Sequence, residues 1–408
     1  MLSITLHRPF SGRSAIFTLG LALALASVVS RADGQARSTP EAGNVKQLWE
    51  TAIADDSFEV EYKASAVSTI DSSVWLVVGR RAALTMSGQQ DLALVALDRN
   101  GKILSETSLQ SLAGTAGLTH VPDKFIDLAA TTGGNIAVVL RSGGQTSVVT
   151  VDGKSRRVIQ GKDIGAARPN LLVARAVAIP GGNLLLLGRL GPGAVAIKLD
   201  PKLAVVWERP ADPKGAGVFT DAAVLSDENF VVTGTHSARP GSSDESSLWL
   251  GRLDAEGQVT KSIFMPGQFA SVATGPDGGC ALVQGMVGPQ GADFWFRSYD
   301  RDLKEEWSTK LLSGTRDLMS FRIVPAGQGE YVVLGSEKHH LWISRVRAGA
   351  GVQWSQTFGD PPGAMPVLVW NFGLARAGSS VVVVTTDMVV NAKMQQRQIV
   401  RARNMDIR

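Results

Sequence analysis

The sequence predicts an all-β protein, a seven-bladed β-propeller with four antiparallel strands in each blade. Three observations support this fold. A turn-and-strand motif occurs seven times, its copies lie about 50 residues apart, and the two ends of the chain hold complementary parts of one repeat. A fixed period of this size is typical of proteins in which small β-sheets repeat radially around an axis.

The repeated motif is a small or acidic pair, then Asn, Ser or Gly, then four apolar residues, usually with a Gly shortly afterwards. The first apolar residues of the seven copies are Val74, Ile136, Leu184, Phe230, Cys280, Tyr331 and Val381. The intervals between them are 62, 48, 46, 50, 51 and 50 residues. The small or acidic pair predicts a tight turn, and the apolar run predicts a buried strand.

Each repeat contains signals for four strands, which we name a to d from the axis outward. Strand a leads to the motif turn, strand b is the apolar run, strand c ends at a second turn, and strand d follows it. The second turn is expected at Asp98, Asp152, Asp200, Asp254, Asp300, Arg347 and Asn404. In two of these turns a Gly follows three residues after the Asp, where it can supply a positive φ.

The chain ends before the seventh repeat has a strand d. Residues 45–51 contain Trp49-Glu50-Thr51, which resembles the strand-d segments that begin at Trp207 and Trp307. We therefore expect the first strand of the mature protein to complete the last blade. This closure would remove an exposed sheet edge.

The N-terminus has the pattern of a secretory signal peptide over residues 1–30. Arg8 and Arg13 precede an apolar run from Ala15 to Val29, and small residues follow at Ser30 and Ala32. The alternative is a retained membrane anchor, for which the run is short. Residues 31–44 are expected to be a flexible leader and residues 45–408 a single propeller domain. A cleaved signal predicts a periplasmic or secreted protein with no transmembrane segment.

The charge and the single cysteine exclude several classes of function. Removing residues 1–30 takes away two arginines and no acidic residue, so the net charge falls from +4 to +2. Without a basic cluster, binding of nucleic acid is not expected. Cys280 stands at a strand-b position and is predicted to be a buried thiol rather than a nucleophile. His339 and His340 are adjacent, so on a strand their rings would point apart, and no metal or cofactor site is expected.

Seven of the nine tryptophans occupy two repeat positions, in strands c and d. We interpret these as packing residues between blades, although clustered Trp can also form a platform for sugars or nucleic acid. Trp370 lies outside this pattern and is the Trp most open to a surface role.

A set of polar residues stands nine positions before the start of strand b, at the expected start of strand a. The seven residues are Ser65, Asp127, Arg175, Asp221, Ser271, Arg322 and Phe372. Because strand a lines the central channel of a propeller, these residues are predicted to form a mixed-charge ring. They could pair with one another and with backbone amides, or Asp127, Arg175, Asp221 and Arg322 could form a pocket for a small ligand.

Long loops between strands b and c mark the other candidate site. The loop from Thr235 to Ser247 contains His236, Arg239, Asp244 and Glu245, and residues 80–90 and 385–397 are comparably extended. Extended loops on one face of a repeat protein usually mark the binding face. We therefore predict that this face contacts a partner.

The repeat resembles that of secreted bacterial propellers with units of the form Asp-Gly-Gly-(apolar)4-x-Gly. The segments that carry the resemblance are Asp277–Gly285, Asp293–Phe296, Leu341–Ser344 and Trp354–Gly359. The chain is also loosely similar to quinoprotein-like scaffold propellers such as the outer-membrane assembly protein BamB, but it lacks their lipobox cysteine. The resemblance implies the propeller fold of a secreted bacterial protein and says little about function.

Two functions are compatible with the sequence. The first is a non-enzymatic binding or scaffold protein, expected to be a monomer, that engages an envelope or exported protein through its loop face. The second is a hydrolase or lyase that acts on a sugar or lactone in the central channel, with Asp127, Asp221, Arg175 and Arg322 as the candidate residues. General acid–base catalysis would need these carboxylates to be close together and to differ in pKa.

Overall fold

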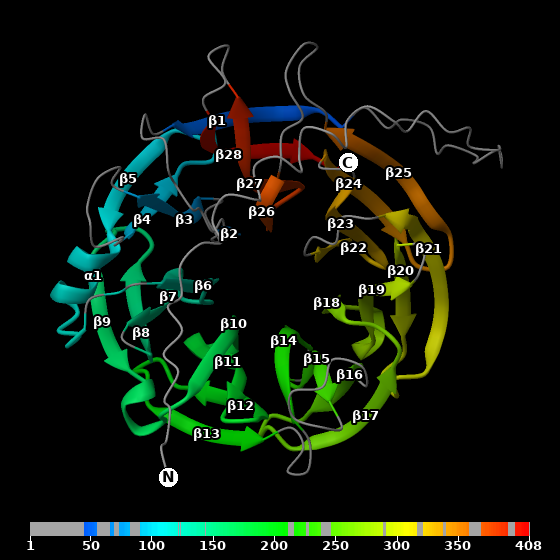
Figure 1. The fold of residues 1–408 in the computed structure, drawn as a ribbon, viewed down its shortest axis with the longest axis horizontal. Coiled ribbons are helices and arrows are strands. Elements are labelled where there is room, and N and C mark those ends of the chain that lie inside the picture. The colour runs from blue at the N-terminus through cyan, green and yellow to red at the C-terminus, as the bar shows by residue number, and fades with distance from the viewer. Residues whose placement is uncertain are drawn as a thin grey trace, which may run out of the picture. The chain divides into compact units, whose positions relative to one another are not determined.

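Seven four-stranded antiparallel sheets form the described part of the chain, as the sequence predicts. The structure, a computed structural model, describes residues 45–54, 66–68, 73–81, 90–120, 122, 124–142, 144–210, 216–225, 228–237, 246–288, 291–315, 321–337, 340–358, 369–390 and 396–407. The sheets follow one another in chain order around a central axis (Figure 1). The protein is a seven-bladed β-propeller.

In the first four blades the strands pair in sequence order, from the innermost strand a to the outermost strand d. Blade 1 consists of β2 (Ala66–Ser68), β3 (Val74–Arg81), β4 (Gln90–Leu97) and β5 (Ile103–Ser108). Blade 2 consists of β6 (Lys124–Ala130), β7 (Asn135–Ser142), β8 (Gln145–Asp152) and β9 (Val158–Asp163). Blade 3 consists of β10 (Leu171–Ile179), β11 (Asn183–Leu190), β12 (Gly193–Leu199) and β13 (Val205–Pro210). Blade 4 consists of β14 (Ala216–Val224), β15 (Phe230–Ser237), β16 (Ser246–Leu253) and β17 (Val259–Met265).

Blades 5 and 6 repeat this order, and blade 7 takes its outermost strand from the other end of the chain. Blade 5 consists of β18 (Phe269–Thr274), β19 (Cys280–Gly288), β20 (Gly291–Tyr299) and β21 (Glu305–Thr315). Blade 6 consists of β22 (Arg322–Gly327), β23 (Glu330–Glu337), β24 (His340–Arg347) and β25 (Gly351–Phe358). Blade 7 consists of β26 (Val369–Ala377), β27 (Ser380–Val390), β28 (Gln396–Asp406) and β1 (Gln47–Ala54).

The cores lie between neighbouring blades, and strand b contributes most to them. In blade 3, Leu184, Leu185, Leu186 and Leu187 are each at most 2% exposed, although successive side chains point to opposite faces of the sheet. Leu184 and Leu186 pack toward blade 2, whereas Leu185 and Leu187 pack toward blade 4. Because blades cover both faces of each strand b, the strand has an unbroken apolar run instead of an alternating pattern.

Within the described ranges, short helices interrupt the strand pattern at four places, and none of them was predicted as a helix. The helix α1 (Leu109–Thr115) follows β5 and buries Leu109, Leu112 and Ala113 against blades 1 and 2. The other three are single 3-10 turns, η1 (Gly165–Ala167), η2 (Pro180–Gly182) and η3 (Pro276–Gly278). The insertion of α1 between two blades explains why the first interval is 62 residues, when the others are 46 to 51.

The ring is closed as the sequence predicts, because β1 pairs with β28 as the outermost strand of blade 7. The Ile53 side chain is 5% exposed and packs against Val400 and Ala402. The carboxylate of Glu50 accepts hydrogen bonds from Arg401 and Arg403. Burial raises the pKa of the Glu50 carboxyl, but these two guanidinium groups outweigh it and hold the pKa below its ordinary value.

One predicted turn was wrong. Asn404 was expected to end strand c of the last repeat, but β28 continues to Asp406 and Asn404 pairs with Trp49 of β1. No turn is required at this position, since the strand that follows β28 in the sheet comes from the N-terminal end of the chain rather than from the next residues.

The predicted packing of tryptophans between blades is confirmed for Trp49 and Trp207. Trp49 Nε1 donates to the Arg99 carbonyl oxygen at 2.7 Å, and Trp207 Nε1 donates to that of Ala255 at 3.0 Å. Each contact joins strand d of one blade to the c–d turn of the next. The turn glycines Gly101 and Gly257 have φ values of 83° and 78°, and a Cβ atom there would collide with the Trp ring. These glycines therefore serve both the turn and the blade contact.

Cys280 is buried, as predicted, and this has a measurable consequence. The residue is 2% exposed, and burial raises the pKa of its thiol to about 12. We expect the native protein to react negligibly with Ellman's reagent at pH 8, because the reagent cannot reach the buried Cys280 and almost none of the thiol is ionised. The protein in guanidinium chloride should react at once. Since an unfolded thiol has a pKa of about 8.5, the folded state should lose stability as the pH rises from there toward 12. Rapid labelling of the native protein would contradict this.

Candidate functional site

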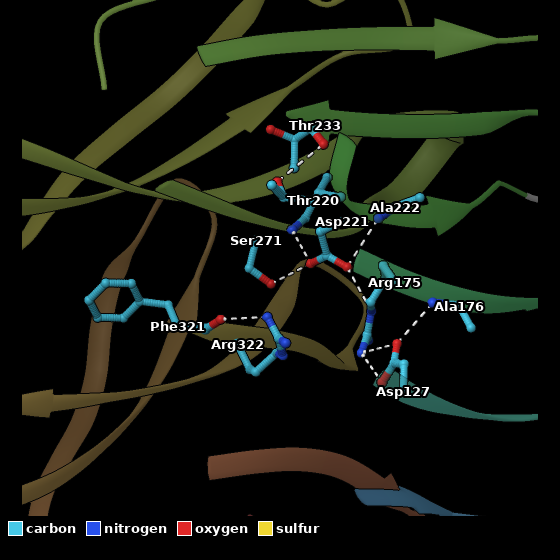
Figure 2. A network of polar contacts seen from close by, with 11 residues as sticks. Asp127, Arg175, Ala176, Thr220, Asp221, Ala222, Thr233, Ser271, Phe321 and Arg322 are labelled. Carbon is cyan, nitrogen blue, oxygen red and sulfur yellow. Dashed lines mark hydrogen bonds and ion pairs between the residues drawn. The ribbon is translucent and has the colours of Figure 1, made fainter. Parts of the chain in front are cut away.

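The structure brings the predicted strand-a residues of blades 2 to 5 into one network, which we call the axial network: Asp127, Arg175, Asp221 and Ser271 (Figure 2). Arg322, on the next blade, lies beside this network. Ser65 lies outside the described residues, and Phe372 belongs to β26, the corresponding strand of blade 7. The prediction that Asp and Arg side chains of neighbouring blades pair with one another is confirmed.

Arg175 lies between the two carboxylates and pairs with both. Its Nη1 is 3.1 Å from Asp127 Oδ2, and its Nε is 3.1 Å from Asp221 Oδ1. The side chains of Asp127 and Asp221 are each 4% exposed, whereas that of Arg175 is 25% exposed. Burial alone would lower the pKa of Arg175, but the two carboxylates raise it above its ordinary value. The guanidinium is thus permanently charged and joins three blades.

The carboxylates also bind backbone amides at the inner edges of the blades. Asp127 Oδ2 accepts from the Ala176 amide at 2.9 Å. Asp221 Oδ2 accepts from the Val272 amide at 3.1 Å and from Ser271 Oγ at 2.6 Å. In both cases the carboxylate accepts from the residue that directly follows the axial-network residue of the next blade. Since strand a is an edge strand, these contacts satisfy amides that no neighbouring strand can pair.

A backbone irregularity positions the three charged residues. In β6, β10 and β14 the pairing with strand b shifts register immediately before Asp127, Arg175 and Asp221. A β-bulge bends its strand and redirects the side chains that follow it. In β18, which carries the neutral Ser271, the register is regular. The sequence showed the charged positions but not these bulges.

The contacts leave the carboxylates little freedom for chemistry. Asp221 accepts four hydrogen bonds, because the Ala222 amide also donates to its Oδ1 at 3.0 Å. Arg175 donates to both oxygens of Asp127. A general base must offer a free lone pair to a substrate proton. The arrangement therefore favours the structural interpretation of these residues, namely a network that joins blades 2 to 5.

Sequence reasoning missed a large pocket on the opposite face from the predicted loops. This turn-face pocket has a volume of about 1270 Å³ and extends from the inner strands of blades 2 to 5 to the outer turns of blades 4 and 5. Its inner wall includes Ala130, Ala178, Val224 and Thr274. Each lies three residues beyond a member of the axial network, a distance of about 10 Å along a strand. Small side chains at this repeat position were the signal that could have indicated the pocket.

The outer wall of the turn-face pocket carries charged side chains, some of which bond to other groups of the same wall. Arg252 Nη1 donates to the carbonyl oxygens of Gly278 at 2.8 Å and Arg301 at 3.0 Å, which ties blade 4 to blade 5. Lys261 Nζ is 3.7 Å from Asp302 Oδ1, and both side chains are exposed. This wall presents charges of both signs.

On the loop face, the structure places His236 in an aromatic cluster. The His236 ring lies edge-on to Phe264, with ring centroids 5.1 Å apart. Phe264, near the end of β17, is 54% exposed, and Phe269, at the start of β18, is 47% exposed. We use the name loop-face aromatic cluster for His236, Phe264 and Phe269, of which His236 and Phe264 are in ring contact. Arg239, Asp244 and Glu245, the other predicted loop residues, lie outside the described residues.

Within the described ranges, no group of three His, Cys, Asp or Glu residues is arranged to hold a metal ion. In the same part of the chain, no helix is both long enough and apolar enough to span a membrane.

Comparison with known proteins shows the fold alone. No family model matches the sequence, and no curated protein sequence matches it. Among solved structures, the chain is similar to the Dos1 propeller, with a TM-score of 0.53, 11% identity, and coverage of 89% of this chain and 95% of that one. It also matches the β-propeller domain of the Trilobed protease from Pyrococcus furiosus, with a TM-score of 0.49, 10% identity, and coverage of 84% and 94%. A third match, the NanB sialidase from Streptococcus pneumoniae, has a TM-score of 0.47, 10% identity, and coverage of 91% and 71%.

Proposed function

We propose that this protein is a non-enzymatic binding propeller of the bacterial envelope that engages another envelope or exported protein through its loop face. The observation that carries the proposal is the loop-face aromatic cluster. Phe264 and Phe269 are about half exposed although they stand beside buried core residues of blades 4 and 5. Aromatic side chains, Phe among them, are enriched in the cores of protein–protein interfaces. The proposed location rests on the signal-peptide pattern of residues 1–30.

The position of the cluster supports a protein partner. Phe264 is the last residue but one of the outermost strand of blade 4, and Phe269 begins the innermost strand of blade 5. A partner that covers both would span the face from the rim toward the axis. The loop that follows His236 is the long one that carries Arg239, Asp244 and Glu245. Apolar anchors surrounded by charged residues are typical of specific interfaces.

The alternative, a hydrolase or lyase, has no comparable support from the geometry. Asp127 and Asp221 are its candidate carboxylates, but Arg175 binds both of them and each also accepts a hydrogen bond from a backbone amide. Activity would require a substrate to displace these bonds. We therefore assign the two residues to the structure of the ring.

Capture of the partner from cross-linked envelope extract tests the proposal. We expect the double substitution Phe264→Ser/Phe269→Ser to reduce recovery of the partner about tenfold or more, since each lost hot-spot residue costs over 1 kcal/mol. His236→Ala should reduce it less. The matched control is Ile159→Ser/Val206→Ser, which removes two apolar side chains that are 49% and 55% exposed on the rims of blades 2 and 3.

Two outcomes of this experiment would count against the loop face. Equal recovery with the double variant and the wild type would reject the aromatic cluster as the binding site. Loss of the partner with Thr274→Trp, which fills the turn-face pocket, but not with the loop-face variants would move the site to the opposite face.

A further inference from the structure

Arg322 differs from the other charged residues beside the axis because it lacks a counter-charge. Among the described residues its guanidinium makes one hydrogen bond, from Nη1 to the carbonyl oxygen of the preceding residue, Phe321, at 3.2 Å (Figure 2). A guanidinium has five N–H donors in a planar fork. No carboxylate in the described part of the chain lies within ion-pair distance of Arg322.

The order of residues around the ring explains this. Blades 2 to 4 carry Asp127, Arg175 and Asp221, so opposite charges alternate and pair. Blade 5 breaks the alternation with Ser271, which is neutral and already donates its hydroxyl to Asp221. Blade 6 then adds a second cation. The two carboxylates are held by Arg175 and by amides, and neither is bonded to Arg322.

The electrostatic environment of Arg322 is consistent with a missing anionic partner. Burial and the nearby positive charge of Arg175 together lower the pKa of Arg322, and the attraction of Asp221 and Asp127 does not compensate for them. Arg322 is partly buried, and a charge that is partly removed from water is normally paired, because an unpaired charge becomes more costly as it loses water. A group with four unused donors and no partner anion is therefore a suitable place for an anion from outside the chain.

We propose that Arg322 binds a small carboxylate or oxyanion on the axial side of blades 5 and 6. Two oxygens of a carboxylate or phosphate match the guanidinium fork and can accept two parallel hydrogen bonds. The anion takes the place that an acidic side chain would occupy if the Asp–Arg alternation continued into blade 5. Its source is either a free small anion or an acidic side chain of a bound protein, since both present the same chemistry.

Calorimetry and thermal unfolding with inorganic phosphate and with succinate test this site, at constant ionic strength set with sodium chloride. We expect saturable binding to the wild type and a parallel rise in its Tm. Arg322→Met should abolish both effects, and Arg322→Lys, which keeps the charge but loses the fork, should weaken binding about tenfold. Arg189→Met removes an exposed arginine of blade 3 and controls for general effects of anions.

The stability of the variants in chloride alone gives a second, independent result. If Arg322 lacks a partner, Arg322→Met should be as stable as the wild type or more stable, because it removes an uncompensated charge. A marked fall in Tm in chloride would show that the protein already neutralises Arg322, and it would overturn the proposal. Equal responses of wild type and Arg322→Met to phosphate and succinate would also overturn it.

Competition distinguishes the two sources of the anion. If an acidic side chain of the partner occupies the site, phosphate should displace the captured partner from the wild type but not from Arg322→Met. If the ligand is a free anion, recovery of the partner should not change with phosphate. The site does not depend on the proposed loop-face function, since the calorimetry requires no partner.

Discussion

Replacing Arg175 with Met is expected to lower the free energy of unfolding by about 3–5 kcal/mol, the cost of leaving buried carboxylates without their partner. Asp127 and Asp221 are each 4% exposed, so the substitution leaves two mostly buried carboxylates without their charged partner. Because Arg175 pairs with both carboxylates, the substitution removes two ion pairs and the side-chain link between blades 2, 3 and 4. Denaturation in urea, followed by tryptophan fluorescence, measures the effect.

Two further variants show whether the effect of Arg175→Met belongs to the axial network. Arg189→Met, in β11 of the same blade, changes an exposed arginine and should alter stability by no more than about 0.5 kcal/mol. Adding Asp127→Asn to Arg175→Met should recover part of the loss, since one stranded carboxylate becomes neutral. If Arg175→Met and Arg189→Met have the same stability, the network does not stabilise the ring.

Deleting residues 45–54 is expected to have a comparable or larger effect, because it removes β1 from blade 7. The deletion eliminates the bonds from Arg401 and Arg403 to Glu50 and uncovers Val400 and Ala402, which are fully buried. It also exposes β28 as a free edge, which can pair with other chains. We expect a fall in Tm of more than about 10 °C, at 2–4 °C per kcal/mol, together with aggregation on heating.

The control for this deletion removes residues 31–40, an equal length of sequence that precedes β1. Its Tm should match that of the protein beginning at residue 31. A milder test of the same closure is acidification, because the lowered pKa of Glu50 contributes stability above the pKa of an unfolded glutamate. That contribution is lost as the pH falls through the folded-state pKa. An unchanged Tm after removal of 45–54 would contradict the role of β1.

The fold was predictable because local patterns and the period agree. Every strand b is an apolar run preceded by turn residues, and the strong repeat fixes how many blades there are and where each begins. The closure was predictable because Trp49-Glu50-Thr51 resembles strand d of other blades. The helix α1 was missed because it has only seven residues, too few to show a helical period, and it directly follows the strand β5. Asn404 was misplaced because a turn was assumed wherever the repeat has one.

The site was predictable only in part, for physical reasons. The repeat alignment places Asp127, Arg175, Asp221 and Arg322 at one position, and pairing follows from their alternating charge. The bulges in β6, β10 and β14 and the reach of each side chain decide which residue remains unpaired. Neither can be deduced from the spacing of the residues in the sequence. The exposure of Phe264 and Phe269 likewise arises from the packing of two neighbouring blades. Their sequence positions resemble those of buried strand residues.

The pairing of β1 with β28 also determines when the protein can finish folding. The bond between Glu50 and Arg403 joins residues 353 positions apart, so β1 cannot pair with β28 until the chain has been synthesised past residue 403. Blades 1 to 6 need only local segments, but blade 7 cannot form on a chain that is still being made or that stops early. Folding of the ring thereby becomes a test of chain completeness. A prematurely terminated product keeps β1 as an unpaired strand, which marks it for proteolysis or aggregation.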